Sequence, residues 1–154
     1  MKFAITQEVD NRAYNKSFLV QDLSNSIQNH VQNINYGQDV ETFYIGFVAV
    51  KTKIGYEHFF KERKPRYVDY KVTKDRLTGL PLETIKQYSY DIKFDNELYD
   101  EFVNSSDEES KKILAREILV SFKHLDKLPK KIRDFDKEKL KADVEQFFKK
   151  QDLI

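Results

Sequence analysis

The chain has 154 residues, of which 40% are hydrophobic and 34% are charged, and its formal net charge at pH 7 is +1. This length suits one core, so we expect residues 1–154 to form a single domain. The absence of cysteine excludes disulfides, zinc–thiolate sites and thiol catalysis. There is neither the apolar stretch of a signal peptide nor an apolar run near the ~20 residues of a membrane helix. We therefore expect a cytoplasmic protein without membrane contact.

The first part of the chain predicts a strand followed by a long helix. Residues 2–6 alternate weakly between apolar and polar side chains, which is typical of a strand. Asp10 or Asn11 can cap a helix over residues 12–35, and Gly37 is expected to end it in the left-handed conformation. The apolar residues of this segment recur mostly every three or four positions and predict one buried face, made of Tyr14, Phe18, Leu19, Leu23, Ile27, Val31 and Ile34.

Residues 42–51 predict the central strand of a sheet. Apolar side chains alternate onto both sides of the extended chain, with Phe43, Ile45, Phe47 and Ala49 on one side and Tyr44, Gly46, Val48 and Val50 on the other. A strand that is apolar on both sides is typically covered on both faces. The following residues 54–64 are compatible with either a short helix or an irregular connection.

Two further strands are predicted to form a hairpin. Residues 66–73 alternate, and residues 87–94 alternate more clearly, with Tyr88, Tyr90, Ile92 and Phe94 on one face. Between them, residues 78–81 have the sequence Thr-Gly-Leu-Pro, which is a turn signal. We therefore expect antiparallel pairing across a loop of residues 75–84.

Three helices are predicted after the hairpin. Asp95 is a suitable N-cap for a short helix, and residues 106–109 have the spacing of a capping box that opens a helix to about Leu128. A last helix is expected over residues 136–150, with buried Leu140, Val144, Phe147 and Phe148. The fold class is α+β: a small, mostly antiparallel sheet with a long N-terminal helix and C-terminal helices packed on it, in the order β-α-β-β-β-α-α-α.

No catalytic or metal-binding motif is present in the sequence. His30, His58 and His124 lie in different predicted elements, and none has a second ligand at helical or hairpin spacing. The four glycines are too scattered to hold a phosphate, and there is no nucleophile elbow or Walker motif. We therefore expect a protein that is not an enzyme and that uses no metal or cofactor.

The charges are unevenly distributed. Residues 91–110 carry one lysine and eight acidic residues, a net charge of −7. Acidic residues at helix starts are favoured by the helix dipole, which is the simpler explanation. The alternative is a contact surface for a basic partner, because the total charge exceeds what capping requires. The residues of this predicted surface are Asp95, Glu97, Asp100, Glu101, Asp107 and Glu108.

A basic stretch precedes the acidic one. Residues 51–90 have a net charge of +5 and interleave basic with aromatic residues, a pattern that can bind single-stranded nucleic acid. However, four acidic residues dilute the charge between Lys51 and Arg76, and the whole chain lacks the positive excess expected of a nucleic-acid-binding protein. The sequence therefore argues against nucleic acid as the partner.

Taken as a whole, this order of elements resembles a family of bacterial polymorphic-toxin immunity proteins, which are small cytoplasmic α+β proteins encoded beside contact-dependent or secreted toxins. The similar features are the start of the chain, a polar-faced first helix, Tyr-Gly before an apolar strand, and three further segments, at residues 1–8, 12–35, 36–37, 43–50, 56–60, 91–95 and 121–125.

The resemblance implies binding without catalysis. The protein would bind one cognate toxin domain, such as a basic nuclease, and block it. The six acidic residues would then steer association and Tyr99 would supply a buried apolar anchor in the interface. The alternative function is a small nucleic-acid-binding protein or a phage or structural adaptor without catalytic activity. The oligomeric state stays open.

Overall fold

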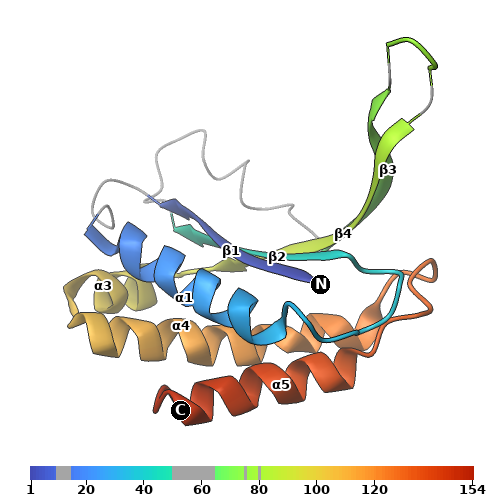
Figure 1. Ribbon diagram of the computed structural model, residues 1–154. Coiled ribbons are helices and arrows are strands. Elements are labelled where there is room, and N and C mark those ends of the chain that lie inside the picture. The colour runs from blue at the N-terminus through green and yellow to red at the C-terminus, as the bar shows by residue number, and fades with distance from the viewer. Residues whose placement is uncertain (10–14, 50–64, 75, 80) are drawn as a thin grey trace.

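The computed structural model describes residues 1–9, 15–49, 65–74, 76–79 and 81–154, which form a four-stranded sheet with helices below it (Figure 1). The order is β1 (Lys2–Val9), α1 (Ser17–Val31), β2 (Thr42–Ala49), β3 (Arg66–Lys74), β4 (Pro81–Lys93), α3 (Asn96–Asn104), α4 (Asp107–Ser121), the 3-10 helix η2 (Phe122–Lys127) and α5 (Lys137–Lys150). This confirms the predicted α+β class and the order of its elements.

The sheet is mixed, with the strand order β1-β2-β4-β3. β2 pairs in parallel with both β1 and β4, while β3 and β4 pair antiparallel. The prediction of a mostly antiparallel sheet was therefore wrong, although the predicted hairpin is confirmed. Alternating hydrophobicity identifies a strand but not its direction, and here the crossover through α1 returns the chain parallel to β1.

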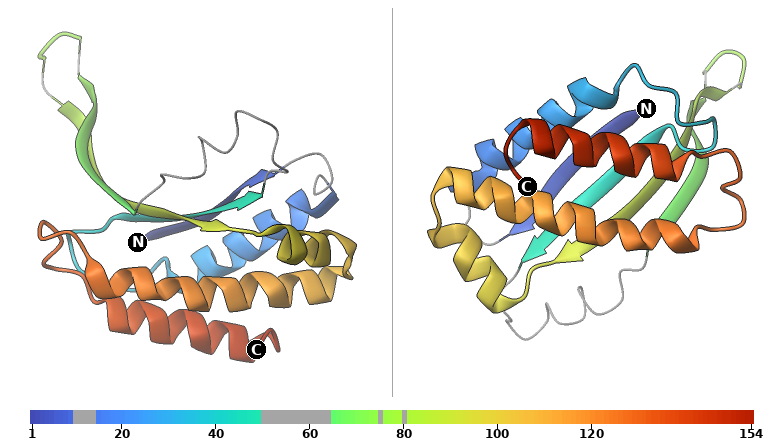
Figure 2. Two further views of the ribbon diagram at one scale, coloured as in Figure 1. Left: turned by 180° about the vertical axis from the view of Figure 1, so that it is seen from behind. Right: turned by 90° about the horizontal axis from the view of Figure 1, so that it is seen from below.

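β2 is an internal strand, as predicted, and its neighbours are β1 and β4. Phe43, Ile45 and Phe47 are fully buried on the face that the helices cover (Figure 2). All described helices lie on this one face. On the other face Val48 is buried but Tyr44 is only half-buried. The described residues therefore cover this face only in part, whereas the sequence predicted that both faces are covered.

An aromatic cluster centres on Phe43 and fills the space between sheet and helices. Five rings lie with their centroids 5.4–6.5 Å from that of Phe43, at the stacked and edge-on separations that aromatic pairs favour, namely Phe3, Tyr88, Tyr90, Phe122 and Phe135. With Phe43 itself, these rings come from three strands, from η2 and from the loop before α5. The cluster therefore joins most layers of the core.

α1 is shorter than predicted and turns one expected core residue outward. The helix spans Ser17–Val31 instead of 12–35, and Phe18 is 77% exposed. At 100° per residue, Phe18 points away from the direction shared by Leu19, Leu23 and Ile27, which are buried. The proposed caps Asp10 and Asn11, the stripe residue Tyr14 and the ambiguous residues 54–64 lie outside the described residues.

Gly37 has the predicted positive φ, +111°, but it does not end the helix. It lies six residues beyond Val31, where the chain passes close to the loop before α5. A Cβ at Gly37 would come 2.3 Å from the carbonyl oxygen of Asp134. The glycine is therefore required by this backbone approach as well as by its conformation.

The helix starts after β4 follow the sequence closely. The side chain of Asp95 accepts a hydrogen bond from the amide of Leu98 at 2.8 Å, and that of Ser106 accepts one from the amide of Glu109 at 3.2 Å. α4 ends at Ser121 and continues as η2, so the predicted single helix to Leu128 is two elements. α5 is confirmed, with Leu140, Val144, Phe147 and Phe148 buried.

β3 and β4 extend beyond the rest of the sheet. β2 pairs with β4 only from Gln87 to Lys93, whereas β3 pairs with β4 as far as Pro81. The outer parts of β3 and β4 form a two-stranded ribbon that rises from the sheet on the side away from the helices (Figure 1). Two register shifts after Lys71 are consistent with a bulge, which increases strand twist.

Candidate interaction surface

The six predicted acidic residues lie on or next to α3 and α4, at the end of the molecule far from the ribbon (Figures 1 and 2). All six are exposed, and we refer to them together as the acidic surface: Asp95, Glu97, Asp100, Glu101, Asp107 and Glu108. The structure therefore brings these side chains to one region of the surface, which consecutive helices present to solvent.

Two members of the acidic surface also stabilise the fold. Asp95 caps α3, as described above. The Asp107 carboxylate accepts a hydrogen bond from the ammonium of Lys16 at 3.0 Å, and this ammonium also donates to the backbone carbonyl of Ser105 at 2.8 Å. Lys16 is 3% exposed, so its charge needs these partners. The contact fixes the start of α1 against the corner between α3 and α4.

The remaining acids are only partly explained by helix capping. Glu97 lies in the first turn of α3 and Glu108 in the first turn of α4, where acidic residues are favoured. Glu101 lies in the second half of α3, where the helix dipole no longer favours an acid. Glu97, Glu101 and Glu108 form no ion pair with any residue that the structure describes. These three carboxylates are therefore available to a partner.

Tyr99 does not belong to this surface. It is 2% exposed, and its ring centroid lies 6.4 Å from that of Phe94 in the core. Helical spacing places Tyr99 on the same face as Phe102, which is also buried. The prediction that Tyr99 anchors a partner was therefore wrong, because a side chain packed in the core cannot enter another protein.

Phe18 is an exposed aromatic side chain, although the sequence pattern predicted that it is buried. Its exposure of 77% is unusual for a phenylalanine, and it lies two residues after Lys16, which contacts Asp107. Asp22 follows it by one helical turn on α1. The predicted buried stripe included Phe18 because it is adjacent to Leu19. The helical spacing of Phe18 from Leu23 and Ile27 could instead have placed it on the exposed side of α1.

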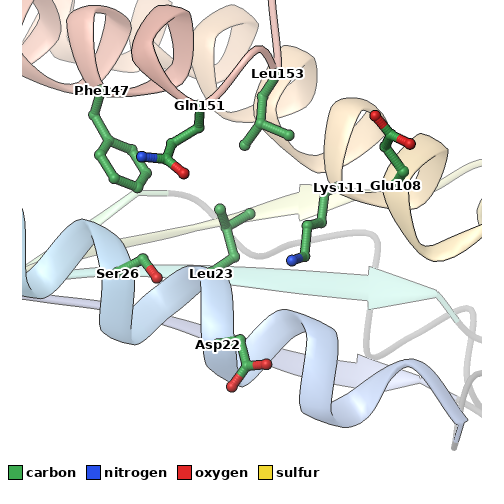
Figure 3. A pocket seen from close by; sticks show the side chains of 8 residues that line it. All are labelled: Asp22, Leu23, Ser26, Glu108, Lys111, Phe147, Gln151 and Leu153. Carbon is green, nitrogen blue, oxygen red and sulfur yellow. The ribbon is translucent and has the colours of Figure 1, made fainter.

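A groove of about 270 Å³ lies between α1, α4 and α5 (Figure 3). Glu108, a member of the acidic surface, lines it together with Asp22 and Lys111. Its apolar walls are formed by Leu23, Phe147 and Leu153. The groove is therefore continuous with the acidic surface and combines carboxylates with apolar walls.

Glu117 on α4 is a further acid that the charge pattern missed. Burial raises the pKa of its carboxyl group, and Asp95 also raises it, against the opposing effects of Arg116 and Lys123. A carboxyl group whose pKa is raised in the folded state costs stability when it is ionised, and this cost disappears as the pH falls through the raised pKa.

We therefore expect Glu117→Gln to stabilise the protein at pH 7, by about 1 °C in Tm because the group is half-exposed and screened by solvent. The gain should vanish towards pH 4. Thermal unfolding followed by circular dichroism at both pH values measures it, with the exposed Glu101→Gln as the control. Equal Tm values for Glu117→Gln and wild type at pH 7 would contradict the expectation.

No described helix is long and apolar enough to span a membrane. Within the same residues, no group of three or more histidine or acidic side chains is placed to hold a metal ion. His124 packs with its ring 4.7 Å from that of Tyr90, and burial lowers the pKa of its imidazole. His30 packs against Phe147, and His58 lies outside the described residues.

The chain is a small α+β protein with a charged, exposed helical surface. A family model described as Immunity protein 44 matches residues 1–150, so the chain belongs to that family, one of the immunity protein families of polymorphic toxin systems. Membership confirms the resemblance seen in the sequence and implies a toxin protein as the partner. No curated protein and no solved structure matched the chain.

Proposed function

We propose that this protein binds a cognate toxin domain through the acidic surface and neutralises it in the bacterial cytoplasm, without catalysis of its own. The observation that carries the proposal is the group of three exposed carboxylates, Glu97, Glu101 and Glu108, that have no ion-pair partner among the described residues. Such groups attract a partner of opposite charge and speed association. The family match supplies the class of partner.

The charge of the acidic surface favours a basic toxin domain, and a nuclease that must itself bind nucleic acid fits this requirement. Binding would then cover the basic surface on which such a toxin depends. The whole chain would act as one domain in this role, because one apolar core includes both Phe3 near the start and Leu153 near the end.

The test uses the toxin domain encoded beside this gene, in a contact-dependent or other secretion system. Bacteria that express this domain should stop growing, and co-expression of the present protein should restore growth. The two purified proteins should form a complex whose association rate falls as salt increases. Failure to restore growth, or no complex at low salt, would refute the proposed function.

A further inference from the structure

We propose that the groove between α1, α4 and α5, with Phe18 beside it, extends the toxin-binding surface and receives a lysine or arginine side chain of the toxin. This inference rests on the proposed function, and it names the part of the interface that would hold the partner most tightly. Charge steering alone raises the association rate more than the affinity. Tight binding also needs buried apolar contacts.

The size of the groove favours a single side chain as its occupant. Its volume of about 270 Å³ lies below the roughly 300–1,000 Å³ of typical small-molecule sites. It is formed at the surface by three helices rather than enclosed in the core (Figure 3). A long side chain that projects from another protein fits such a shape better than a metabolite does.

The lining of the groove favours a basic side chain. Asp22 on α1 and Glu108 on α4 line the groove from opposite sides, and their carboxylates point away from one another, towards its rim (Figure 3). Leu23, Phe147 and Leu153 offer apolar contact. Lysine and arginine have long aliphatic stems that pack on apolar surface while their charged ends stay with polar partners. Both features of the lining therefore match the same kind of side chain.

Lys111 also lines the groove and sets a condition on this binding. Its side chain extends from α4 towards α1 (Figure 3). A second cation in the groove would be repelled by the Lys111 ammonium. Neutralising Lys111 should therefore strengthen binding of a basic side chain. If the occupant were acidic, the same substitution should weaken binding. If the occupant were apolar, the Kd should not change.

Phe18 supplies the apolar contact beside the groove. It lies one turn before Asp22 on α1, so a partner side chain that reaches Asp22 brings its neighbours close to Phe18. At 77% exposure, most of the Phe18 ring is available for burial. Exposed aromatic residues at the centre of an interface commonly carry much of the affinity. Phe18 therefore takes the role that Tyr99 cannot have.

The test measures the Kd of the toxin domain for wild-type protein and three single variants by calorimetry. The toxin domain is obtained by separating it from the co-purified complex under denaturing conditions and refolding it. We expect Phe18→Ala to raise the Kd about tenfold or more and Asp22→Asn about fivefold. Lys111→Gln should lower the Kd about threefold.

Two matched controls lie outside the groove: Val120→Ala, which shortens another exposed apolar side chain, and Asp69→Asn, which neutralises an exposed acid on β3. Neither should change the Kd. Thermal unfolding of every variant verifies that the fold is kept, which is expected because Phe18 and Asp22 are exposed.

The outcomes separate this inference from the proposed function. If the wild type neither binds nor neutralises the toxin, the proposed function fails. If the wild type binds and the pair Glu97→Lys and Glu101→Lys weakens binding, but Phe18→Ala and Asp22→Asn bind as wild type, the groove is refuted and the acidic surface stands. A Kd that rises or stays unchanged on Lys111→Gln would refute a basic occupant.

Discussion

Reversing three charges, Glu97→Lys, Glu101→Lys and Glu108→Lys together, is expected to weaken binding of the toxin domain by about a hundredfold or more. Each substitution replaces attraction for a basic partner by repulsion, and like-charge contacts across an interface cost several kcal/mol. Association rates measured by surface plasmon resonance at two salt concentrations should show most of the loss at low salt, where screening is weakest.

The triple variant should keep its fold, because none of the three residues caps a helix through its side chain or pairs with a described residue. Asp95 and Asp107 are left intact for that reason. The matched control reverses three exposed acids elsewhere, Glu41, Asp69 and Glu145, and so makes the same change in net charge. If both triple variants lose affinity equally, net charge and not the acidic surface governs binding.

Phe43→Ala is expected to reduce the free energy of unfolding by about 3–5 kcal/mol, the usual cost of removing a buried aromatic ring. The side chain is completely buried, and its removal leaves a cavity among five rings from β1, β4, η2 and the loop before α5. Such a loss is a large part of the stability of a typical protein of this size. Urea denaturation would measure it as a lower midpoint with an unchanged slope.

Phe43→Leu keeps most of the apolar volume and should lose clearly less stability than Phe43→Ala. Val120→Ala, at a position 59% exposed, should stay within about 0.5 kcal/mol of wild type. A loss below about 1 kcal/mol for Phe43→Ala would mean that the surrounding rings collapse into the space, and the cluster would then not be the centre of the core.

The features that the sequence predicted well depend on residues close together in the chain. The caps of α3 and α4 are set by side chains three residues from the amides they bind, and the buried face of α5 follows from spacing within one helix. The clear alternation of residues 87–94 placed the inner part of β4. In each case the decisive interaction is local, so a short segment contains the information.

Other features, which the sequence did not predict, depend on packing between distant segments. Parallel pairing of β2 with β1 and β4 results from the path of the chain, which no strand pattern encodes. The exposure of Phe18 and the burial of Tyr99 are different, because both follow from helical spacing within α1 and α3 and could have been predicted from the sequence. At the candidate site, charge identified the acidic residues, but the groove requires three helices that are far apart in sequence.

The outer part of the β3–β4 ribbon gives the chain a natural place to be cut. Its tip presents Arg76 and Leu77 to solvent, with Leu77 96% exposed. Exposed loop tips are preferred sites of proteolysis. Trypsin cleavage after Arg76 would leave β1, α1, β2 and β3 on one fragment and β4 with the following helices on the other. Because both fragments contribute to one apolar core, they should stay together, and the protein could be made as two complementing pieces.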